Sequence, residues 1–596
     1  MKVKVSDFIV KFLEKNNIDT LFSITGGFSM HLNDSFGNNK NFDIYYQHHE
    51  QACGYAAVGY TKTINKPAVL CTTAGIAATN AISPCLVAHQ DSLPILFISG
   101  QVKSTESIRR INTDDMKLRH YAGADCDIIS MVTPITKYAK EILDLSELVD
   151  TLTNAISNLI NGRPGPVWLS IPIDIQGMQM DEVDIPIIKK EVRLISNNID
   201  ELANIDKLLS NSKRPLILVG NGVKLGDCVD KFNTFINKYN IPVVVTILST
   251  DVIETNNELY AGKVGLIGDR HGNFTLQNCD LLISLGCRMA QGIIGYRSEW
   301  FARDAKIVYI DNDENELQKT NLDYTKKINM DLNVFFDNYN YPIYNYDEWK
   351  TKYTHWKNKW IFEMPLEMPS LDDSETQINP YHALKLFYDM APENKITMCA
   401  SGSIVTNVWH MVNIKNNDKF LHSSQGDMGF EIPASIGSQI ALKDKMIVTI
   451  LGEGSLQLNI QELQTIVHYK LPVKILIFNN NSYGANVLTQ NLYFKTKYGV
   501  DKATGVSFPN TEKVSNAYGI KYLAARKYNE LTGMIRNFID SKESVILEVF
   551  VTIQSRFPRL SALKNDDGTF TNKPLEDMDP FLPRDEFNNE MIIKPI

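Results

Sequence analysis

Residues 446–483 read MIVTILGEGSLQLNIQELQTIVHYKLPVKILIFNNNSY, and this stretch decides the fold that we expect. The apolar runs 446–451 and 473–478 have the length of buried strands, and residues 457–469 between them have the pattern of a helix. A strand, a helix and a second strand in this order predict two parallel neighbours in an α/β sheet.

Polar residues follow both predicted strands. Gly452, Glu453, Gly454 and Ser455 come after the first, and their glycines let the backbone turn tightly around a phosphate at a helix start. Asn480 follows the second strand, so its amide and the Glu453 carboxylate should meet at one sheet edge. Oxygen ligands of this kind suit Mg²⁺ bridged to phosphates. Taken alone, each motif would be ordinary loop chemistry, but together they predict a magnesium and diphosphate site.

The chain has 596 residues, which predicts three domains, and the alternation of strand-like runs with helical patterns predicts that each is a doubly wound α/β domain with a parallel sheet. We expect them at residues 1–182, 195–341 and 375–554, followed by a polar tail at 555–596. Residues 342–379 are rich in Trp, Tyr, Lys and Asp and indicate a long surface connection.

Composition narrows the class of protein. Hydrophobic residues make up 44% and charged residues 22%, as in soluble globular proteins, and the net charge of -9 argues against a nucleic-acid partner. No signal-like or membrane-spanning apolar run is present, and the eight cysteines form no C-x-x-C pair. These features predict a cytoplasmic protein with reduced thiols.

The pattern G-E-G-S, helix, N-N resembles that of thiamine-diphosphate enzymes, which carry G-D-G-S, a helix and N-N. The resemblance implies that Glu453, Asn480 and the backbone carbonyl of Ser482 hold Mg²⁺ against the cofactor's diphosphate. Glu453 is a departure, because most relatives have Asp there.

The same resemblance extends over nearly the whole chain. Glu50 lies in His49-Glu50-Gln51-Ala52, similar to the family's H-E-Q-A, and would favour the pyrimidine tautomer that deprotonates the weakly acidic thiamine C2. Met428, in a segment similar to G-A-M-G-F, would support the bent cofactor, and Gln101 would face the active site. Without the resemblance, Glu50 reads as a surface residue of a helix. The further implied cofactor contacts are Gly26, Gly27, Asn80, Ser403, Gly452, Gly454 and Ser455.

The middle domain resembles acetolactate synthases, in which the matching segments line an FAD site. A G-x-G turn alone is weak evidence, because many α/β turns have it without a ligand. The residues that the resemblance assigns to FAD here are Gly220, Gly222, His271, Gly272, Arg288 and Asp311.

The resemblance therefore implies an acetolactate synthase-like enzyme that decarboxylates a 2-keto acid such as pyruvate and joins the product to a second carbonyl. It implies a homodimer or homotetramer with cofactor between the first domain of one subunit and the third of another, and leaves a separate regulatory subunit open. Thr489 stands where biosynthetic relatives have an acceptor-shaping Trp, so a bulkier acceptor is expected. The alternatives are a simple 2-keto-acid decarboxylase, an FAD-dependent oxidase and a catalytically silent binding subunit, which the presence of Glu50 disfavours.

Overall fold

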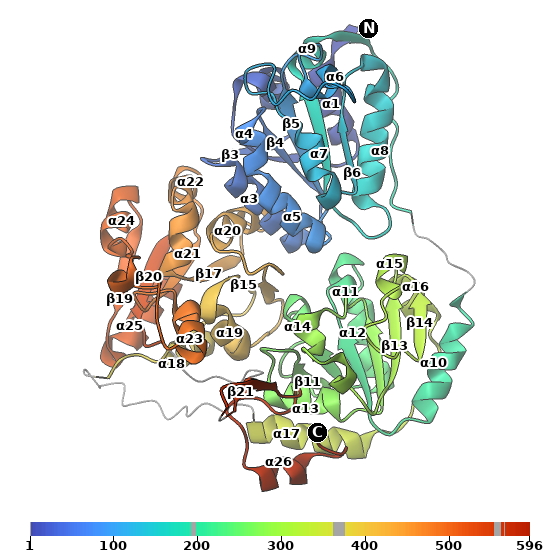
Figure 1. The fold of residues 1–596 in the computed structure, drawn as a ribbon, viewed down its shortest axis with the longest axis vertical. Coiled ribbons are helices and arrows are strands. Elements are labelled where there is room, and N and C mark those ends of the chain that lie inside the picture. The colour runs from blue at the N-terminus through green and yellow to red at the C-terminus, as the bar shows by residue number, and fades with distance from the viewer. Residues whose placement is uncertain (1, 192–197, 361–375, 554–561, 566) are drawn as a thin grey trace.

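The computed structural model describes all residues except 1, 192–197, 361–375, 554–561 and 566. Its architecture is three six-stranded sheets in which every neighbouring pair of strands is parallel, each sheet flanked by helices (Figure 1). The predicted fold class is confirmed. No helix within the described residues combines the length and apolar character needed to cross a bilayer.

The first sheet has the strand order β3-β2-β4-β5-β7-β6. Apolar side chains cover both of its faces, with α1 (Val5–Lys15) and α8 (Leu148–Ile160) on one and α3 (Glu50–Ile64) and α5 (Ile82–Gln90) on the other. Two-sided burial explains why its strands are nearly continuous hydrophobic runs. The strands are β2 (Thr20–Ser23), β3 (Asp43–Tyr46), β4 (Ala68–Thr72), β5 (Ile95–Gln101), β6 (Tyr138–Glu141) and β7 (Val167–Pro172).

The middle sheet has the order β11-β10-β9-β12-β13-β14. With β9 as its first strand, this is the 3-2-1-4-5-6 order of dinucleotide-binding folds. The strands are β9 (Pro215–Val219), β10 (Val243–Val245), β11 (Tyr260–Lys263), β12 (Leu281–Leu285), β13 (Lys306–Asp311) and β14 (Lys326–Asn329).

The third sheet, ordered β16-β15-β17-β18-β20-β19, repeats the topology of the first. The two predicted strands are confirmed as β17 (Met446–Gly452) and β18 (Lys474–Asn479). The helix between them begins earlier than expected and is broken into α21 (Glu453–Leu456), a 3₁₀ turn (Gln457–Asn459) and α22 (Glu462–His468). The remaining strands are β15 (Lys395–Met398), β16 (Lys419–Leu421), β19 (Lys521–Ala525) and β20 (Val545–Phe550).

Helix α3 of the first domain crosses α20 (Glu431–Ala441) of the third at very short range (Figure 1). A Cβ on Gly59 would lie 2.0 Å from the Ala434 carbonyl oxygen, and one on Gly437 would lie 1.8 Å from that of Ala56. Only glycine permits this approach, and the apolar side chains of both helices share one core. The crossing fixes the first and third domains of one chain relative to each other.

The prediction of a surface connection at 342–379 is wrong where residues are described. Helix α17 (Asp347–Trp360) packs on the middle domain and buries Trp349, Tyr353, Trp356 and Trp360. This spacing puts the four aromatic rings on one face of a helix. Residues 361–375 lie outside the described residues.

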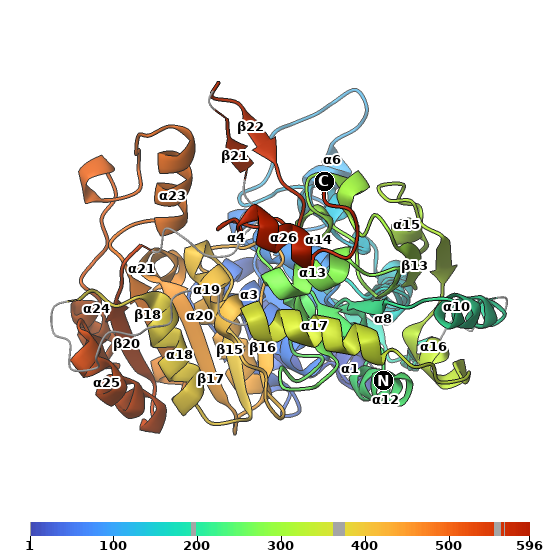
Figure 2. The ribbon, with the colours of Figure 1, turned by 90° about the horizontal axis from the view of Figure 1, so that it is seen from below.

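The prediction of a merely polar tail is also wrong. After a hairpin of β21 (Ala562–Lys564) and β22 (Phe570–Asn572), the chain returns to the middle domain and ends with α26 (Arg584–Glu590) beside α17 (Figures 1 and 2). Phe587 packs against Phe274, and the Glu590 carboxylate accepts a hydrogen bond from the Trp356 indole at 2.9 Å. The expected boundaries at 195, 375 and 554–555 fall outside the described residues.

Candidate cofactor sites

A cavity of about 260 Å³ opens where the strands of the third sheet end. The loops after β15, β16, β17, β18 and β20 supply its wall, as expected for a ligand site at the carboxyl ends of parallel strands. Every described residue that lines it falls between 380 and 552. Eight residues predicted from the sequence line it together: Ser403, Met428, Gly452, Glu453, Gly454, Ser455, Asn480 and Ser482.

Two predicted magnesium ligands converge on one backbone amide. The Ser482 N–H donates to Glu453 Oε1 at 2.9 Å and to Asn480 Oδ1 at 3.1 Å. Asn481 between them has a left-handed backbone (φ 56°), which Asn tolerates, and so turns the chain back toward Glu453. Burial raises the pKa of Glu453 to about 7, against hydrogen bonds from backbone amides that lower it.

The donor chemistry of this cavity fits a hard cation. Within the described residues there is no cluster of three or more His, Cys, Asp or Glu side chains that could hold a metal. A metal here would bind one carboxylate, an amide oxygen, a carbonyl and oxygens of a ligand, which is the pattern that Mg²⁺ uses with phosphates.

Glycines keep the backbone of the cavity open. A Cβ on Gly454 would lie 2.4 Å from the Tyr483 ring, and Gly402 has a left-handed backbone (φ +74°). Helix α19 (Gly402–Met411) starts at the cavity, so its free N–H groups and dipole favour an anion there. Both features fit a diphosphate.

The predicted residues of the first domain form a separate group. Glu50 is the first residue of α3, which His49 caps by accepting from the Gln51 N–H, and Glu50 Oε2 accepts from Asn80 Nδ2 at 2.9 Å. Gly26 packs so closely on Thr73 that a Cβ would clash at 2.4 Å. Gly27, by contrast, has open space around it.

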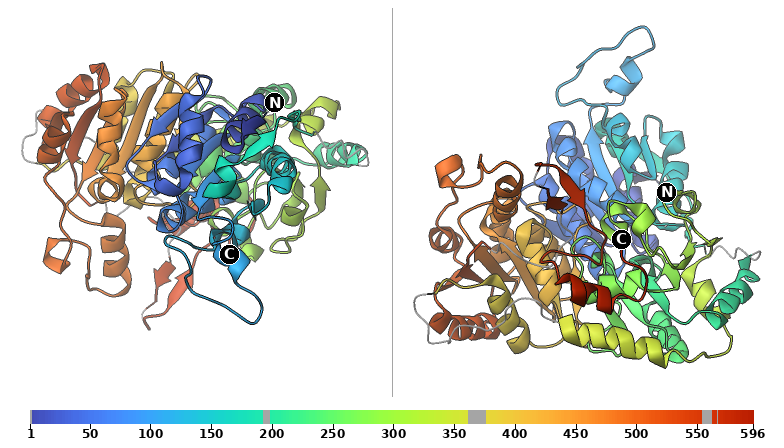
Figure 3. Two further views of the ribbon diagram at one scale, coloured as in Figure 1. Left: turned by 90° about the horizontal axis from the view of Figure 1, so that it is seen from above. Right: turned by 60° about the horizontal axis from the view of Figure 1, so that its bottom comes forward.

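Gln101 ends β5 and is buried, with its amide fully engaged. Its Nε2 donates to the Cys126 carbonyl at 2.9 Å, and its Oε1 accepts from the Val102 N–H. These bonds close the base of the projecting segment 102–126, which carries the short helix α6 (Ile108–Ile111) and stands away from the sheet (Figures 2 and 3). None of the predicted first-domain residues lines the third-domain cavity.

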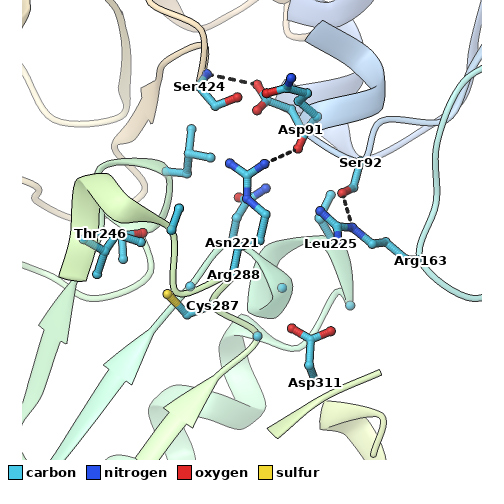
Figure 4. A pocket seen from close by; sticks show the side chains of 18 of the residues that line it. Asp91, Ser92, Arg163, Asn221, Leu225, Thr246, Cys287, Arg288, Asp311 and Ser424 are labelled. Carbon is cyan, nitrogen blue, oxygen red and sulfur yellow. Dashed lines mark hydrogen bonds between the residues drawn. The ribbon is translucent and has the colours of Figure 1, made fainter. Parts of the chain in front are cut away.

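A second cavity, of about 500 Å³, lies between the first and middle domains, and Trp409, His422 and Ser424 of the third domain also line it (Figure 4). It brings together Gly220, Gly222, Arg288 and Asp311, four of the six residues predicted for FAD. A Cβ on Gly220 would lie 2.2 Å from the Gly286 carbonyl oxygen, so only glycine fits at this position in the turn after β9.

The polar residues of this cavity come from different domains. The Arg288 guanidinium reaches across to the first domain and donates to the Gln90 carbonyl at 2.7 Å. Asp311 ends β13, and its burial raises its pKa to about 6. A carboxylate at the carboxyl end of a strand in this sheet can accept hydrogen bonds from ligand hydroxyls.

The other two predicted FAD residues lie outside this cavity. His271 and Gly272 are inside the middle domain on α13 (Arg270–Gln277), where burial lowers the pKa of His271 to about 4. His271 neighbours Asp269 at 3.6 Å, and a Cβ on Gly272 would lie 2.3 Å from the Lys263 carbonyl oxygen. Their surroundings are those of packed core residues.

Sequence reasoning missed residues that complete both cavities. Asn407 and Thr552 line the third-domain cavity, and neither belongs to a motif that the sequence analysis singles out. Asp91 and Arg163 line the interdomain cavity from the first domain. Asp91 pairs with Lys62 of its own domain at 2.7 Å. No local sequence pattern indicates that Asp91 or Arg163 faces another domain.

Three family descriptions match successive parts of the chain. They are "Thiamine pyrophosphate enzyme, N-terminal TPP binding domain" over residues 3–131, "central domain" over 202–334 and "C-terminal TPP binding domain" over 400–549.

Curated relatives match along nearly the whole chain. The probable acetolactate synthase large subunit of Methanococcus aeolicus is 29% identical over 91% of both chains. The acetolactate synthase large subunit of Lactococcus lactis subsp. lactis is 27% identical over 92% of both chains. The chloroplastic acetolactate synthase of Arabidopsis thaliana is 28% identical over 92% of this chain and 81% of its own.

Proposed function

Since the chain belongs to the thiamine pyrophosphate enzymes and is acetolactate synthase-like, we propose that it decarboxylates pyruvate and joins the two-carbon product to a second carbonyl, with Mg²⁺ as the metal. One observation carries this proposal most directly: Glu453 and Asn480 converge on Ser482 in a glycine-lined cavity at the strand ends.

In this proposal Glu453, Asn480 and the Ser482 carbonyl hold Mg²⁺. The diphosphate would bind at Gly454, where the loop has no side chain, and at the start of α19. Met428 would support the cofactor's rings from the cavity wall. When bound, thiamine diphosphate supplies the carbon acid and electron sink that decarboxylation of a 2-keto acid requires.

Glu50 has the proton-handling role. With the cofactor bound, its carboxylate would hydrogen-bond the pyrimidine ring and would favour the tautomer that can accept a proton, and Asn80 Nδ2, which donates to Glu50 Oε2 at 2.9 Å, orients the carboxylate. Gln101 fixes the base of the projecting segment 102–126 through its hydrogen bond to the Cys126 carbonyl.

The proposed active site needs two copies of the chain. The third-domain cavity has no first-domain residue in its wall, so Glu50 would come from a second copy, and a homodimer is the minimum assembly. The relatives named large subunits make a smaller companion subunit worth testing by co-purification.

We further propose that FAD occupies the interdomain cavity. The turn at Gly220 and Gly222, the Asp311 carboxylate and Arg288 are the groups that would contact it. Flavin absorption in the purified protein, released on denaturation and lost in Asp311→Ala, would support this assignment. A colourless protein that binds no added FAD would contradict it.

For the location we propose the cytoplasm, because all eight cysteines are free thiols. The reaction is tested by incubating purified protein with pyruvate, Mg²⁺ and thiamine diphosphate and identifying products by mass spectrometry. Acetolactate supports the proposal. Acetaldehyde would favour a simple decarboxylase, acetate an oxidase, and no product a silent subunit.

A further inference from the structure

Glu431 is a fully buried carboxylate directly behind the third-domain cavity. It is the first residue of α20, three positions after Met428, and its exposed fraction is 0%. Burial and the nearby Asp427 raise its pKa, and hydrogen bonds from Ser455 and Ser401 oppose this rise. Its charge is therefore compensated by hydrogen-bond donors.

Both carboxylate oxygens are used. Glu431 Oε1 accepts from the Ala400 N–H at 3.3 Å and from the N–H and Oγ of Ser401 at 3.1 and 2.9 Å. Glu431 Oε2 accepts from Ser455 Oγ at 2.6 Å. Ser455 Oγ in turn accepts from the Gly429 N–H at 2.8 Å. One side chain thus connects the loops that follow β15, β16 and β17.

These three loops, with the helix starts that follow them, form about half of the cavity wall. The first carries Ser401 and Ser403, the second carries Met428, and the third carries Glu453 and Ser455. An apolar side chain at position 431 would leave the Ala400 and Ser401 amides and the Ser455 hydroxyl without their buried acceptor. The loops would then have no common attachment.

We propose that Glu431 is a positioning residue that sets the spacing of the three cofactor loops before any cofactor binds. The proposal rests on the proposed function for the identity of the cofactor. It adds that the diphosphate and metal site is organised from behind by a group that touches neither.

Glu462 provides a matched control in the same domain. It is equally buried, at 0% exposed, and accepts from Thr465 Oγ1 at 2.6 Å, Gln47 Nε2 at 3.2 Å and the His48 N–H at 3.1 Å. None of these partners lines the cavity. Glu462→Gln therefore disturbs a buried carboxylate of similar bonding without touching the loops.

The test compares Glu431→Gln, Glu431→Ala and Glu462→Gln by two measurements. Hydrogen exchange is measured in cofactor-free protein, and the Kd for thiamine diphosphate with Mg²⁺ is measured by calorimetry. We expect both Glu431 variants to exchange faster at 400–402, 427–430 and 453–455. Their Kd should rise about tenfold or more, as is typical when the support behind metal ligands is lost. Glu462→Gln should leave hydrogen exchange at the three loops near the wild-type values, whatever it does to the melting temperature.

Wild-type exchange and Kd in Glu431→Gln and Glu431→Ala would overturn the proposal, and so would equal loosening of the three loops by Glu462→Gln. If the wild-type protein binds no thiamine diphosphate, the proposed function fails on its own. The exchange experiment still decides the role of Glu431, because it uses no cofactor.

Discussion

The first and third domains share one strand order but end their strands differently. In the third domain the loops after β17 and β18 present Glu453 and Asn480 to a cavity, whereas in the first domain the end of β5 places Gln101 in a closed set of hydrogen bonds. The first domain instead offers Glu50 at the start of a helix. The difference shows that topology sets where chemistry can lie, and that the loops decide which chemistry it is.

Glu50→Gln should have the largest effect. The amide keeps the size of the side chain but cannot support the proton shift on the cofactor ring, so turnover should fall by about a thousandfold or more. Cofactor affinity and melting temperature should stay near wild type. Steady-state kinetics beside the partly exposed control Glu147→Gln measures the loss, and near-normal turnover would remove Glu50 from the proposed chemistry.

Glu453→Ala tests the third domain's part of the comparison, and its effect should be the second largest. Without its carboxylate ligand the Mg²⁺-dependent affinity for thiamine diphosphate should fall by about a hundredfold, whereas Glu453→Asp should keep or improve it. Calorimetric titrations with and without Mg²⁺ separate the two variants. An unchanged affinity in the alanine variant would exclude Glu453 from the metal shell.

Glu141, a buried acid in the first domain, should make the stability of the protein depend on pH without any ligand. Burial raises the pKa of Glu141 from 4.5 to about 7, so the folded chain binds more protons than the unfolded chain between these values. Stability should therefore fall as pH rises from 4.5 to 7 and stay reduced above 7.

Glu141→Gln should remove this fall and stabilise the protein at pH 8 by ~2 kcal/mol, below the ~3 kcal/mol of the full shift, because the amide needs a new acceptor. At pH 4.5, where the wild-type carboxyl is largely neutral in the fold, the variant should be less stable by about 1 kcal/mol, the cost of the amide alone. Urea unfolding at both values checks the sign, and a variant less stable at pH 8 would contradict it.

Thr489→Trp should have the smallest effect. Thr489 does not line the cavity of a single chain, but it lies one turn beyond Ala485 and Asn486, which do, on the same face of α23 (Gly484–Tyr493). A Trp there should narrow the acceptor range and raise the yield from 2-ketobutyrate over pyruvate by about tenfold at most. Competition between acceptors measures the ratio, with Asn491→Trp on the opposite face as control. The same ratio in wild type and Thr489→Trp would mean that position 489 is not part of the acceptor site.

The sequence predicted the parts of the fold and site that follow from strand ends. Parallel neighbours end at one edge, so the convergence of Glu453 and Asn480 could be expected from the strand–helix–strand pattern. The first and third sheets share a topology that no close sequence repeat reveals, because topology constrains only the burial pattern.

Other features depend on side-chain direction and long-range packing. A motif match assigned His271 to FAD but could not tell which way α13 turns it, and the structure places it in the core. The composition of residues 342–360 indicates a surface segment, whereas the helical spacing of Trp349, Tyr353, Trp356 and Trp360 is the feature that matches the buried face of α17. Glu431 stands near Met428 in sequence, yet its connection of three loops appears only in three dimensions.

The central claim, that each active site combines Glu50 of one chain with the third domain of another, is tested by mixing two inactive variants. Glu50→Gln and Glu453→Ala are unfolded and refolded together, and acetolactate formation is compared with that of each variant refolded alone. In a mixed dimer one of the two sites has both carboxylates, so random pairing should restore about a quarter of wild-type activity. No recovery in mixtures that are shown to contain mixed dimers would mean that each chain builds its site alone, and would contradict the account.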